Sequence, residues 1–403
     1  MTSLDLAREF ELTALPPDFA DDPFPVYRAL LEHAPVKRFS DGSIMLSRHA
    51  DLDRVYRDTK TFSSDKKQEF LPKYGNTPLY EHHTTSLVFN DPPLHTRVRK
   101  IMVGAMTPRA LAAMEPGLVA LVDRLLDRLA EKREVDLVED FASAIPVEVI
   151  GNLFDMPHEE RGPLRDWSLA ILGALEPVLT TAQHERGNRA VTAFKSYLGQ
   201  LADERRRRPG DPQTDVLTRL IAGNDGELLT ETELLQNCIF ILNAGHETTT
   251  NLIGNALFEL HDWPDEKQRL LENPDLIDTA VDEFLRFQSP NQLGNRLAVE
   301  PAEFHGETIS PGTRIHLAIG AANRDPRQFA EPDRLDLARK PNKHLAFAGG
   351  PHLCVGFSLA RMEGRVAISR FLQRFPDFTI GGEPRRTGRV RFRGFSALPA
   401  RVR

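Results

Sequence analysis

One cysteine in a glycine-rich segment has the setting best suited to chemistry in this sequence. Cys354 lies within residues 347–356, which also contain three glycines, and a helix is predicted to follow over 357–374. Glycines let the backbone pass close to a flat group, and the unpaired N–H groups at a helix start favour a thiolate. Such a thiolate is a nucleophile or a metal ligand. No second cysteine lies nearby, so the segment offers too few ligands for zinc or an iron–sulfur cluster.

An acid and an alcohol are neighbours in a second segment that could do chemistry, residues 244–250. Glu247 and Thr248 follow Gly245, and the glycine and the run of three threonines are poor helix formers. A threonine hydroxyl can bond to the carbonyl four residues earlier, so Thr248 is predicted to bond to Ala244 and to bend the helix. Together with Gly245, this would leave a small polar notch. The alternative is a helix that tolerates weak residues because its packing compensates.

Helices must position both segments. The acid–alcohol pair is predicted to lie in one long helix, because Thr230 and Glu233 have the spacing of a capping box and the apolar pattern runs to about Asp262, before Pro264. Apolar residues at intervals of three and four predict further helices over 116–133, 191–206 and 275–287. Alternating stretches predict strands over 43–47, 296–299, 314–318 and 389–395. The expected fold class is therefore mainly α with a small β portion.

Length and composition exclude several classes of protein. The chain has 403 residues and neither an internal repeat nor a flexible linker, so a single domain over 1–403 is predicted. Its net charge of −7 argues against a protein that coats nucleic acid or an anionic membrane. No signal peptide or membrane span is found, so we expect a soluble cytoplasmic protein. Only two cysteines occur, so the sequence argues against a disulfide framework, and Cys238, on an apolar helix face, is expected to be a core residue.

The cysteine segment resembles the haem-binding loop of cytochrome P450 monooxygenases. It matches their Phe-x-x-Gly-x-x-x-Cys-x-Gly pattern at four positions, which are Phe347, Gly350, Cys354 and Gly356. The centre of the long helix is similar to the oxygen-activation motif of the same family, with its glycine, acid and alcohol at Gly245, Glu247 and Thr248. Together with the matches below, the resemblance covers most of the chain from residue 91 onward. A buried structural cysteine in a glycine-rich turn is the alternative for Cys354.

A third match concerns structure rather than chemistry. Glu283 and Arg286 have the spacing of the family's Glu-x-x-Arg pair, which the family completes with an arginine from a downstream Pro-x-Arg segment. Residues 332–334 match that segment, so Arg334 is the expected third member, although Leu335 stands where the family commonly has phenylalanine. A Glu/Arg pair at this spacing is otherwise a surface ion pair of little energetic value.

The resemblance implies one haem b group, held noncovalently because the sequence has no Cys-x-x-Cys-His attachment site. Cys354 would be the axial ligand of the iron. The haem propionates need charge-assisted hydrogen bonds, and the positions that match the family's propionate ligands are His95, Arg99, Arg296 and His352. The haem-binding set also includes Ala244, Gly245, Phe347, Gly350 and Gly356. The alternatives to a haem-binding role are solvated charges for the two arginines and capping or core positions for the two histidines.

The implied reaction is insertion of one oxygen atom from dioxygen into an organic substrate, because a thiolate ligand favours O–O cleavage. Glu247 would gate proton delivery, and Thr248 would hold the reacting oxygen and a water by hydrogen bonds. The sequence has no dinucleotide-binding loop, so electrons would come from a separate ferredoxin and an NAD(P)H-dependent reductase. The candidate docking charges are Arg97, Lys100, Arg109, Arg361 and Arg365, with solvated helix faces as the alternative. The arginine run 205–208 is expected to be solvated surface.

The family's substrate-lining regions suggest a small to medium, mostly apolar substrate with one polar group, to be hydroxylated or O-dealkylated. The residues that these regions offer here are Leu87, Val88, Asn243, Ala244, Gln292, Leu293 and Phe395. A Lys/His-rich stretch in the first region could hold a substrate carboxylate, but an exposed mobile loop is the favoured interpretation. That stretch contains Lys66, Lys67, Lys73, His82 and His83.

Other functions were weighed against this one. A peroxygenase that uses hydrogen peroxide directly is disfavoured because relatives of that kind typically lack the acid–alcohol pair, which is present at Glu247 and Thr248. A haem-binding sensor or carrier without turnover is disfavoured by the same two residues. A zinc hydrolase would need a His-Glu-x-x-His or comparable spacing, which the sequence lacks.

Overall fold

The computed structural model describes residues 2–104, 106–212, 214–223 and 228–403. Helices far exceed strands, which confirms the predicted fold class. The chain forms two compact units, each assembled from separate stretches of sequence. Unit 1 comprises Met1–Ser63, Val119–Ser143 and Thr248–Arg403, and unit 2 comprises Ser64–Leu118 and Ala144–Glu247. A single domain over 1–403 stays a prediction.

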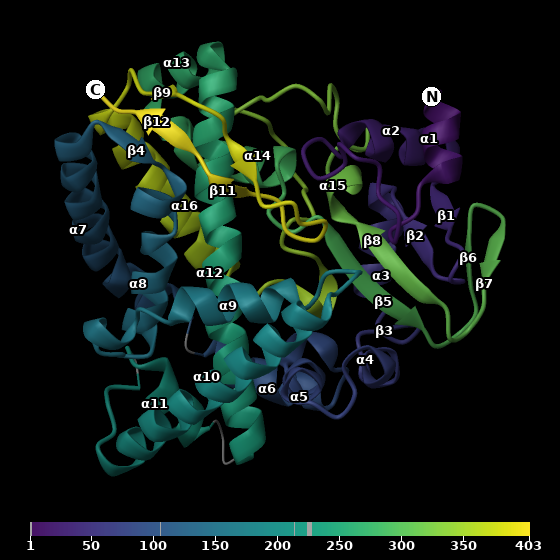
Figure 1. The fold of residues 1–403 in the computed structure, drawn as a ribbon, viewed down its shortest axis with the longest axis horizontal. Coiled ribbons are helices and arrows are strands. Elements are labelled where there is room, and N and C mark those ends of the chain that lie inside the picture. Colours follow the sequence, from purple (N-terminus) through teal and green to yellow (C-terminus); the bar gives the residue numbers. More distant parts are fainter. Residues whose placement is uncertain (1, 105, 213, 224–227) are drawn as a thin grey trace. The chain divides into compact units, whose positions relative to one another are not determined.

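Unit 2 is helical throughout its described residues (Figure 1). Its helices are α4 (Lys67–Tyr74), α5 (Pro78–Thr85), the short η1 (Leu87–Phe89), α6 (Leu94–Val103), the start of α7 (Pro108–Lys132), α8 (Ala144–Leu153), the short η3 (His158–Glu160), α9 (Leu164–Gly173), α10 (Thr181–Arg207), α11 (Val216–Ala222) and the first part of α12 (Glu231–Asp262). Helix α10 packs against α5, α9 and α11. A Cβ added at Gly187 would lie 2.8 Å from Cδ1 of Leu79, so α10 approaches α5 closely at a position that only glycine fills without displacing a neighbour.

Unit 1 contains the larger sheet. Its strand order is β1-β2-β8-β5-β3, with β2 and β8 parallel and the other neighbours antiparallel (Figure 1). The strands are β1 (Val36–Arg38), β2 (Ile44–Leu46), β3 (Phe62–Ser63), β5 (Leu293–Ala298) and β8 (Arg314–Ala318). Ile44, Ile315 and Leu317 are fully buried in one core cluster with Val55 from α3 (His49–Arg57). Burial of such side chains stabilises each by roughly 1.5–3 kcal/mol relative to exposure.

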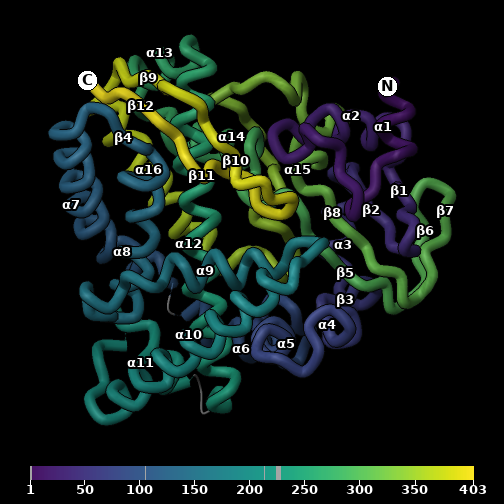
Figure 2. Tube along the Cα trace, viewed as in Figure 1, coloured from purple at the N-terminus to yellow at the C-terminus, as the bar shows by residue number. Residues whose placement is uncertain are grey.

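The remaining elements of unit 1 are helices and short strand pairs. The helices are α1 (Ser3–Glu9), α2 (Phe24–His33), the end of α7, η2 (Val138–Ala142), the second part of α12, α13 (Pro264–Glu272), η4 (Pro274–Leu276), α14 (Ile277–Phe287), α15 (Ile319–Ala322), η5 (Gly350–His352) and α16 (Phe357–Arg374). Strand β12 (Pro399–Arg401) pairs with both β4 (Glu134–Asp136) and β9 (Thr379–Ile380), as the tube in Figure 2 shows. Two further pairs are β6 (Ala302–Phe304) with β7 (Glu307–Ile309), and β10 (Arg385–Arg386) with β11 (Phe395–Ala397).

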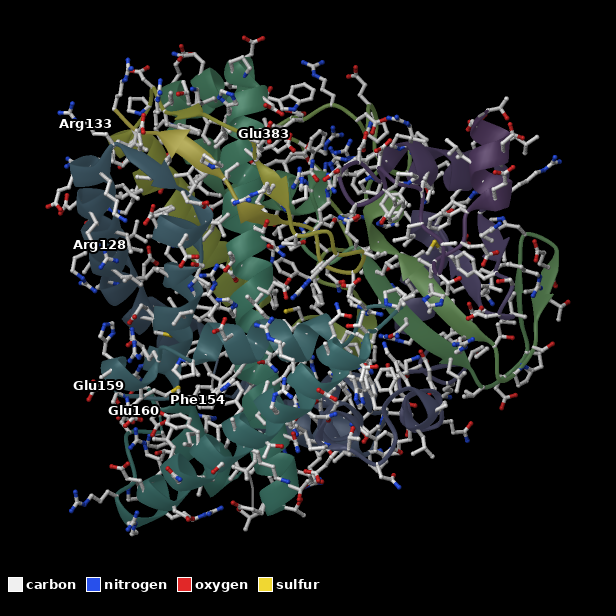
Figure 3. The ribbon with its side chains drawn as sticks, viewed as in Figure 1. Arg128, Arg133, Phe154, Glu159, Glu160 and Glu383 are labelled. Atoms are coloured by element: carbon white, nitrogen blue, oxygen red, sulfur yellow. The ribbon has the colours of Figure 1, made fainter. Side chains whose placement is uncertain are left out.

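The predicted helices are present, with starts that differ. The capping box is confirmed, because the Thr230 hydroxyl accepts from the Glu233 N–H at 3.2 Å and the Glu233 carboxylate accepts from the Thr230 N–H at 2.8 Å. The helix over 357–374 is also confirmed. Helix α7 starts earlier than predicted and passes through Pro116, at the loss of one helical hydrogen bond. Its amphipathic pattern is real, since Leu125 is fully buried and Arg128, labelled in Figure 3, is exposed.

Of the predicted strands, the first three are present and the last is wrong. Residues 389–394 lie in the connection between β10 and β11, where Phe392 forms only an isolated bridge with Asn291, and β11 begins at Phe395. The alternating pattern misled because Val390 and Phe392 are buried, as in a strand. The arginines between them bond elsewhere: Arg391 donates to the Leu293 carbonyl at 3.0 Å, and Arg393 donates to two carbonyls near residue 20.

Candidate active site

The loop before α16 holds the candidate cysteine in a tight turn. The Cys354 N–H donates to the Phe347 carbonyl at 3.0 Å, which closes the loop. Gly350 has a φ of +59°, and a Cβ added there would lie 2.2 Å from the Tyr56 carbonyl oxygen. Any other residue would therefore combine backbone strain with a clash against α3. The backbone angle and the contact with Tyr56 therefore explain the glycine at 350, independently of what the loop binds.

The same loop presents a surface that fits a haem. Cys354 is exposed, and the neighbouring Leu353 exposes 36% of its surface, which is high for a large apolar side chain. A Cβ added at Gly356 would meet no atom within 4 Å, so the backbone there borders open space. A thiol, an apolar side chain and an uncovered backbone stretch match the needs of a flat apolar group with a metal that accepts a thiolate.

Cationic candidates for the haem propionates lie in both units. In unit 1, Arg296 on β5 is 6% exposed, donates from Nη1 to the Asn295 carbonyl at 2.7 Å, and lies 5.3 Å from the centre of the Tyr56 ring. His352 in η5 is buried. In unit 2, His95 and Arg99 lie one turn apart on α6, the histidine buried and the arginine half-buried.

The centre of α12 carries the acid and the alcohol in different settings. Glu247 is 3% exposed, whereas Thr248 is half-buried and continues a half-buried row with Ala244 and Phe240 at four-residue spacing. Such spacing puts the row on one face of the helix. The predicted bond from Thr248 to Ala244 stays a prediction.

The glycine at position 245 is required by a packing contact that the sequence analysis did not predict. A Cβ added there would lie 2.6 Å from Cδ1 of Ile150, so α8 packs directly against α12 at this position. This contact does not test the Thr248–Ala244 bond, so the polar notch stays a prediction. At Gly245 itself, close packing against α8 accounts for the glycine. Cys238, on the same helix, is fully buried and burial raises its pKa, which confirms it as a core residue.

A buried ion-pair cluster surrounds Glu283 on α14. Arg286 donates from Nε and Nη2 to the two Glu283 carboxylate oxygens, each at 2.7 Å, and both side chains are fully buried. The third member is Arg339, whose Nε lies 3.1 Å from both oxygens. The Asn342 amide also donates to Glu283, at 3.1 Å. Each carboxylate oxygen is thus paired, as a buried charge requires.

The predicted third member, Arg334, was wrong. Its side chain is 61% exposed and pairs with Glu331 at 3.6 Å. It contributes to the cluster only through its carbonyl, which accepts from Arg286 at 3.3 Å and from Arg339 at 3.2 Å. Residues 332–334 therefore turn their backbone toward the cluster, and the chain brings in a guanidinium five residues later. No spacing in the sequence distinguishes these two arginines.

Comparison with known proteins identifies the family. The family model described as "Cytochrome P450" matches residues 36–387. The chain belongs to the cytochrome P450 family. It is 38% identical over 389 residues to the "Biotin biosynthesis cytochrome P450" of Bacillus subtilis (95% of this chain, 96% of the relative). It is 36% identical over 366 residues to the "Vitamin D(3) 25-hydroxylase" of Pseudonocardia autotrophica (90% and 88%).

A solved structure agrees with this assignment. The structure of P450BioI in complex with hexadec-9Z-enoic acid ligated acyl carrier protein superposes with a TM-score of 0.91, at 33% identity, over 96% of this chain and all of that one. This cytochrome P450 is accordingly an oxidoreductase of the monooxygenase class, in a family of haem-thiolate enzymes. Within the described residues, none of its helices combines the length and apolar character that a membrane crossing requires.

The two amides among the predicted substrate contacts have different settings. Gln292 donates from Nε2 to the Ser289 carbonyl at 2.7 Å, and its Oε1 lies where a side chain at Gly320 would be, so packing holds it in place. Asn243 is 1% exposed, and neither atom of its amide has a hydrogen-bond partner among the described residues. Only the Asn243 carbonyl is engaged, by the Ser168 hydroxyl at 3.4 Å.

The apolar residues predicted to contact the substrate also lie in different settings. Leu293 belongs to a core cluster with Tyr27 and Ala321, and Phe395 packs 4.8 Å from Phe258 with the Arg386 guanidinium 3.7 Å from its ring. Both are therefore packing positions of unit 1. Leu87 and Val88 lie in η1 of unit 2, the leucine buried and the valine half-buried.

The Lys/His-rich stretch was wrongly interpreted as an exposed mobile loop. It forms α4 and α5, and Lys66, His82 and His83 are almost fully buried. Lys66 pairs with Glu69 at 3.0 Å, and His82 shares a hydrogen bond with Gln236 at 2.9 Å. Burial lowers the pKa of His82 to about 4, so it is neutral at physiological pH. Lysine and histidine at interior positions misled the analysis because polarity was taken as exposure.

Several basic residues predicted to be free for a partner are paired. Arg97 bonds to Glu233 and to the Leu228 carbonyl, and Arg361 donates to Asp282 at 2.6 Å. Lys100 and Arg109 are exposed. The arginine run 205–208 is not simply solvated, because Arg205 is buried and bonds to Asp215 at 2.8 Å and Asp155 at 2.9 Å.

One group that the sequence analysis missed is Glu363 on α16. It is 2% exposed and receives a hydrogen bond from the Thr249 hydroxyl at 3.4 Å. Its other oxygen has no hydrogen-bond partner among the described residues. Burial raises its pKa to about 8. The sequence signal that could have identified this group is a glutamate within the apolar stripe of the predicted helix over 357–374.

Proposed function

We propose that this cytochrome P450 is a haem-thiolate monooxygenase that inserts one oxygen atom into a small to medium, mostly apolar substrate, by hydroxylation or O-dealkylation. The observation that carries the proposal is the loop before α16, where the exposed Cys354 thiol adjoins an exposed leucine and open space at Gly356. A bound haem b would supply an iron at which dioxygen is reduced and activated.

The chain's own residues would bind and orient that haem. The Cys354 sulfur would bind the iron as a thiolate, which the start of α16 favours through its dipole. Phe347, Gly350 and Gly356 would shape the loop around it. The cationic residues proposed to hold the propionates are His95, Arg99, Arg296 and His352. Ala244 and Gly245 would contribute the α12 backbone.

Glu247 and Thr248 would handle the protons that oxygen reduction consumes. Glu247 is buried, which restricts its exchange of protons with water to a defined path. The half-buried Thr248 hydroxyl can donate and accept at the same atom, so its Oγ1 would order a water and pass on a proton.

Electrons would come from a separate ferredoxin and an NAD(P)H-dependent reductase. Lys100 and Arg109 are proposed to meet the acidic donor, because both side chains are exposed and positively charged.

The proposed substrate contacts are Leu87, Val88, Asn243, Gln292, Leu293 and Phe395, of which the last three also pack within unit 1. Support for an apolar substrate comes from the named relatives, one of which is a vitamin D(3) 25-hydroxylase and one of which was solved with a hexadecenoyl acyl carrier protein. The first ligands to test are therefore hexadec-9Z-enoic acid, free and carrier-linked. A shift of the haem spin state on addition would identify a ligand that enters the active site.

The absorption spectrum of the reduced, carbon monoxide-bound protein tests the haem-thiolate assignment. We expect a strongly red-shifted Soret band that is lost in Cys354→Ser and kept in the matched control Cys238→Ala, because Cys238 is a core residue. A Soret band typical of histidine ligation in the natural protein, or its survival in Cys354→Ser, would refute the assignment.

Thr248→Ala tests the proton-handling role. We expect haem binding to survive while electrons are diverted from product to hydrogen peroxide. Unchanged coupling of electron use to product would count against the role of Thr248. Turnover with added peroxide as fast as with ferredoxin would favour a peroxygenase instead.

A further inference from the structure

The buried carboxyl of Glu363 has a setting unlike that of an ordinary structural glutamate. It lies in the second turn of α16, the helix that starts three residues after Cys354. Its Oε2 accepts from Thr249, and its Oε1 has no hydrogen-bond partner among the described residues. A carboxylate would leave a full charge without compensation in this place, so the group is stable there only as a neutral acid.

Among the described residues, the charged side chains near this part of α16 have other partners. On α7, which packs against α16, Asp123 pairs with Arg370 and Asp127 with Arg374. Helix α14 and the second part of α12 also pack against α16 here. The engaged pairs are Asp278 with Arg365, Asp282 with Arg361 and His344, Glu283 with Arg286 and Arg339, and Glu259 with Gln288. His261 and Asp262 lie at the far end of α12.

Thr249 links Glu363 to the segment of α12 that carries Thr248. It follows Thr248 directly on α12, and its own side chain is 2% exposed. Gly364, the residue after Glu363, shows how closely α16 approaches α12 and α14. A Cβ added at Gly364 would lie 3.0 Å from Cδ2 of Leu252 and 3.3 Å from Cγ1 of Val281. The bond therefore joins two helices that have little room to readjust.

We propose that neutral Glu363 is a positioning residue for the reaction: through Thr249, it holds the α12 turn that carries Thr248 against the helix that follows Cys354. The inference rests on the proposed function, because it assigns Thr248 and Cys354 their roles. Loss of the bond lets the α12 turn shift, and a misplaced Thr248 hydroxyl releases hydrogen peroxide in place of product. Ionisation of Glu363 near pH 8 weakens the same hold, because a buried charge draws the carboxyl toward water.

The first experiment requires no haem. Difference infrared spectra of the purified protein at pH 7 and pH 9.5 are recorded for the natural chain, Glu363→Gln and Thr249→Val. We expect the carbonyl stretch of a protonated carboxyl at pH 7, its loss at pH 9.5, its absence in Glu363→Gln and its shift to higher frequency in Thr249→Val. A missing band at pH 7, or an unshifted band in Thr249→Val, overturns the proposal.

The second experiment measures the fraction of consumed electrons that appears as hydrogen peroxide, between pH 7 and pH 9. We expect this fraction to rise several-fold with pH in the natural enzyme, to be high already at pH 7 in Thr249→Val, and to stay low throughout in Glu363→Gln, whose amide cannot ionise. The matched control is Ser369→Ala, since the Ser369 hydroxyl on the same helix bonds to the Val366 carbonyl of that helix; it should follow the natural profile. A natural profile in Glu363→Gln overturns the proposal.

The two experiments separate the inference from the function on which it rests. If the protein lacks the red-shifted Soret band, the proposed function fails, and the infrared result still decides whether Glu363 is a neutral acid bonded to Thr249. If the band is present and peroxide release is the same in Thr249→Val as in the natural enzyme, only the positioning role fails.

Discussion

Two glutamates of unit 1 are both almost completely buried but have very different numbers of hydrogen-bond donors. Glu283 on α14 is fully buried and receives hydrogen bonds from Arg286, Arg339, Asn342 and the Asp336 N–H. Glu363 on α16 is almost as buried and receives one long bond from Thr249. The first carboxyl is a compensated anion and the second is a neutral acid. The number of donors, and not the depth of burial, decides which of the two a buried carboxyl becomes.

The largest expected effect comes from Glu283→Gln. The substitution removes the anion and leaves two guanidinium groups in the interior without a counter-charge, which costs about 3–5 kcal/mol of unfolding free energy. Chemical denaturation, or the yield of folded protein where the variant is too unstable, measures it. A loss below about 1 kcal/mol would show that Glu283 is not the centre of the cluster.

The next effect distinguishes the two candidate arginines. Arg339→Ala should destabilise the protein by about 1–3 kcal/mol, because it removes a charged hydrogen-bond donor from a buried carboxylate. Arg334→Ala should cost less than about 0.5 kcal/mol, because its exposed pair with Glu331 contributes little. Both are measured by denaturation under the same conditions. The reverse order would restore Arg334 as the third member.

The pH dependence of stability tests the other glutamate. The pKa of Glu363 is raised to about 8, so between the unfolded value and pH 8 the folded state holds a proton that the unfolded chain has released. Its favourable contribution is complete below the unfolded pKa and is lost as pH rises toward 8, with a slope of at most about 1.4 kcal/mol per pH unit. Glu363→Gln should flatten this part of the profile. An equally steep profile in the variant would mean that other groups cause it.

The smallest effect concerns the bond between the two helices. Thr249→Val keeps the shape of the side chain and removes one hydrogen bond, so it should cost only about 0.5–1.5 kcal/mol. Its denaturation midpoint, compared with that of Ser369→Ala, measures the difference. A cost similar to that of Glu283→Gln would mean that Glu363 depends on Thr249 as strongly as Glu283 depends on its arginines.

Much of the local structure could be predicted from sequence. The capping box at Thr230 and Glu233 acts within one turn, and the glycine at 350 is required by its own backbone angle and by one neighbouring carbonyl. The family resemblance of the segment around Cys354 was sufficient to predict the class of enzyme. These features depend on residues a few positions apart, whose geometry follows from chain connectivity.

The failed predictions share a different cause. Residues 389–395 alternate like a strand, but Arg391 and Arg393 bond to backbone carbonyls elsewhere in unit 1. His82 is polar and yet interior, and it shares a hydrogen bond with Gln236 on α12. The partners of Arg391, Arg393 and His82 are distant in sequence, so composition and periodicity carry no information about them.

The sequence by itself determined the mainly helical fold class, the haem-loop motif at Cys354 and the acid–alcohol pair at Glu247 and Thr248. The tertiary structure alone decided that Arg339 completes the cluster around Glu283, that Ile150 occupies the space beside Gly245, and that Glu363 meets Thr249. Short-range features are set by backbone sterics and local hydrogen bonds. The charge state of a buried carboxyl is set by the donors that the fold brings within about 3 Å, and most of these, such as Arg339 beside Glu283, come from residues far along the chain.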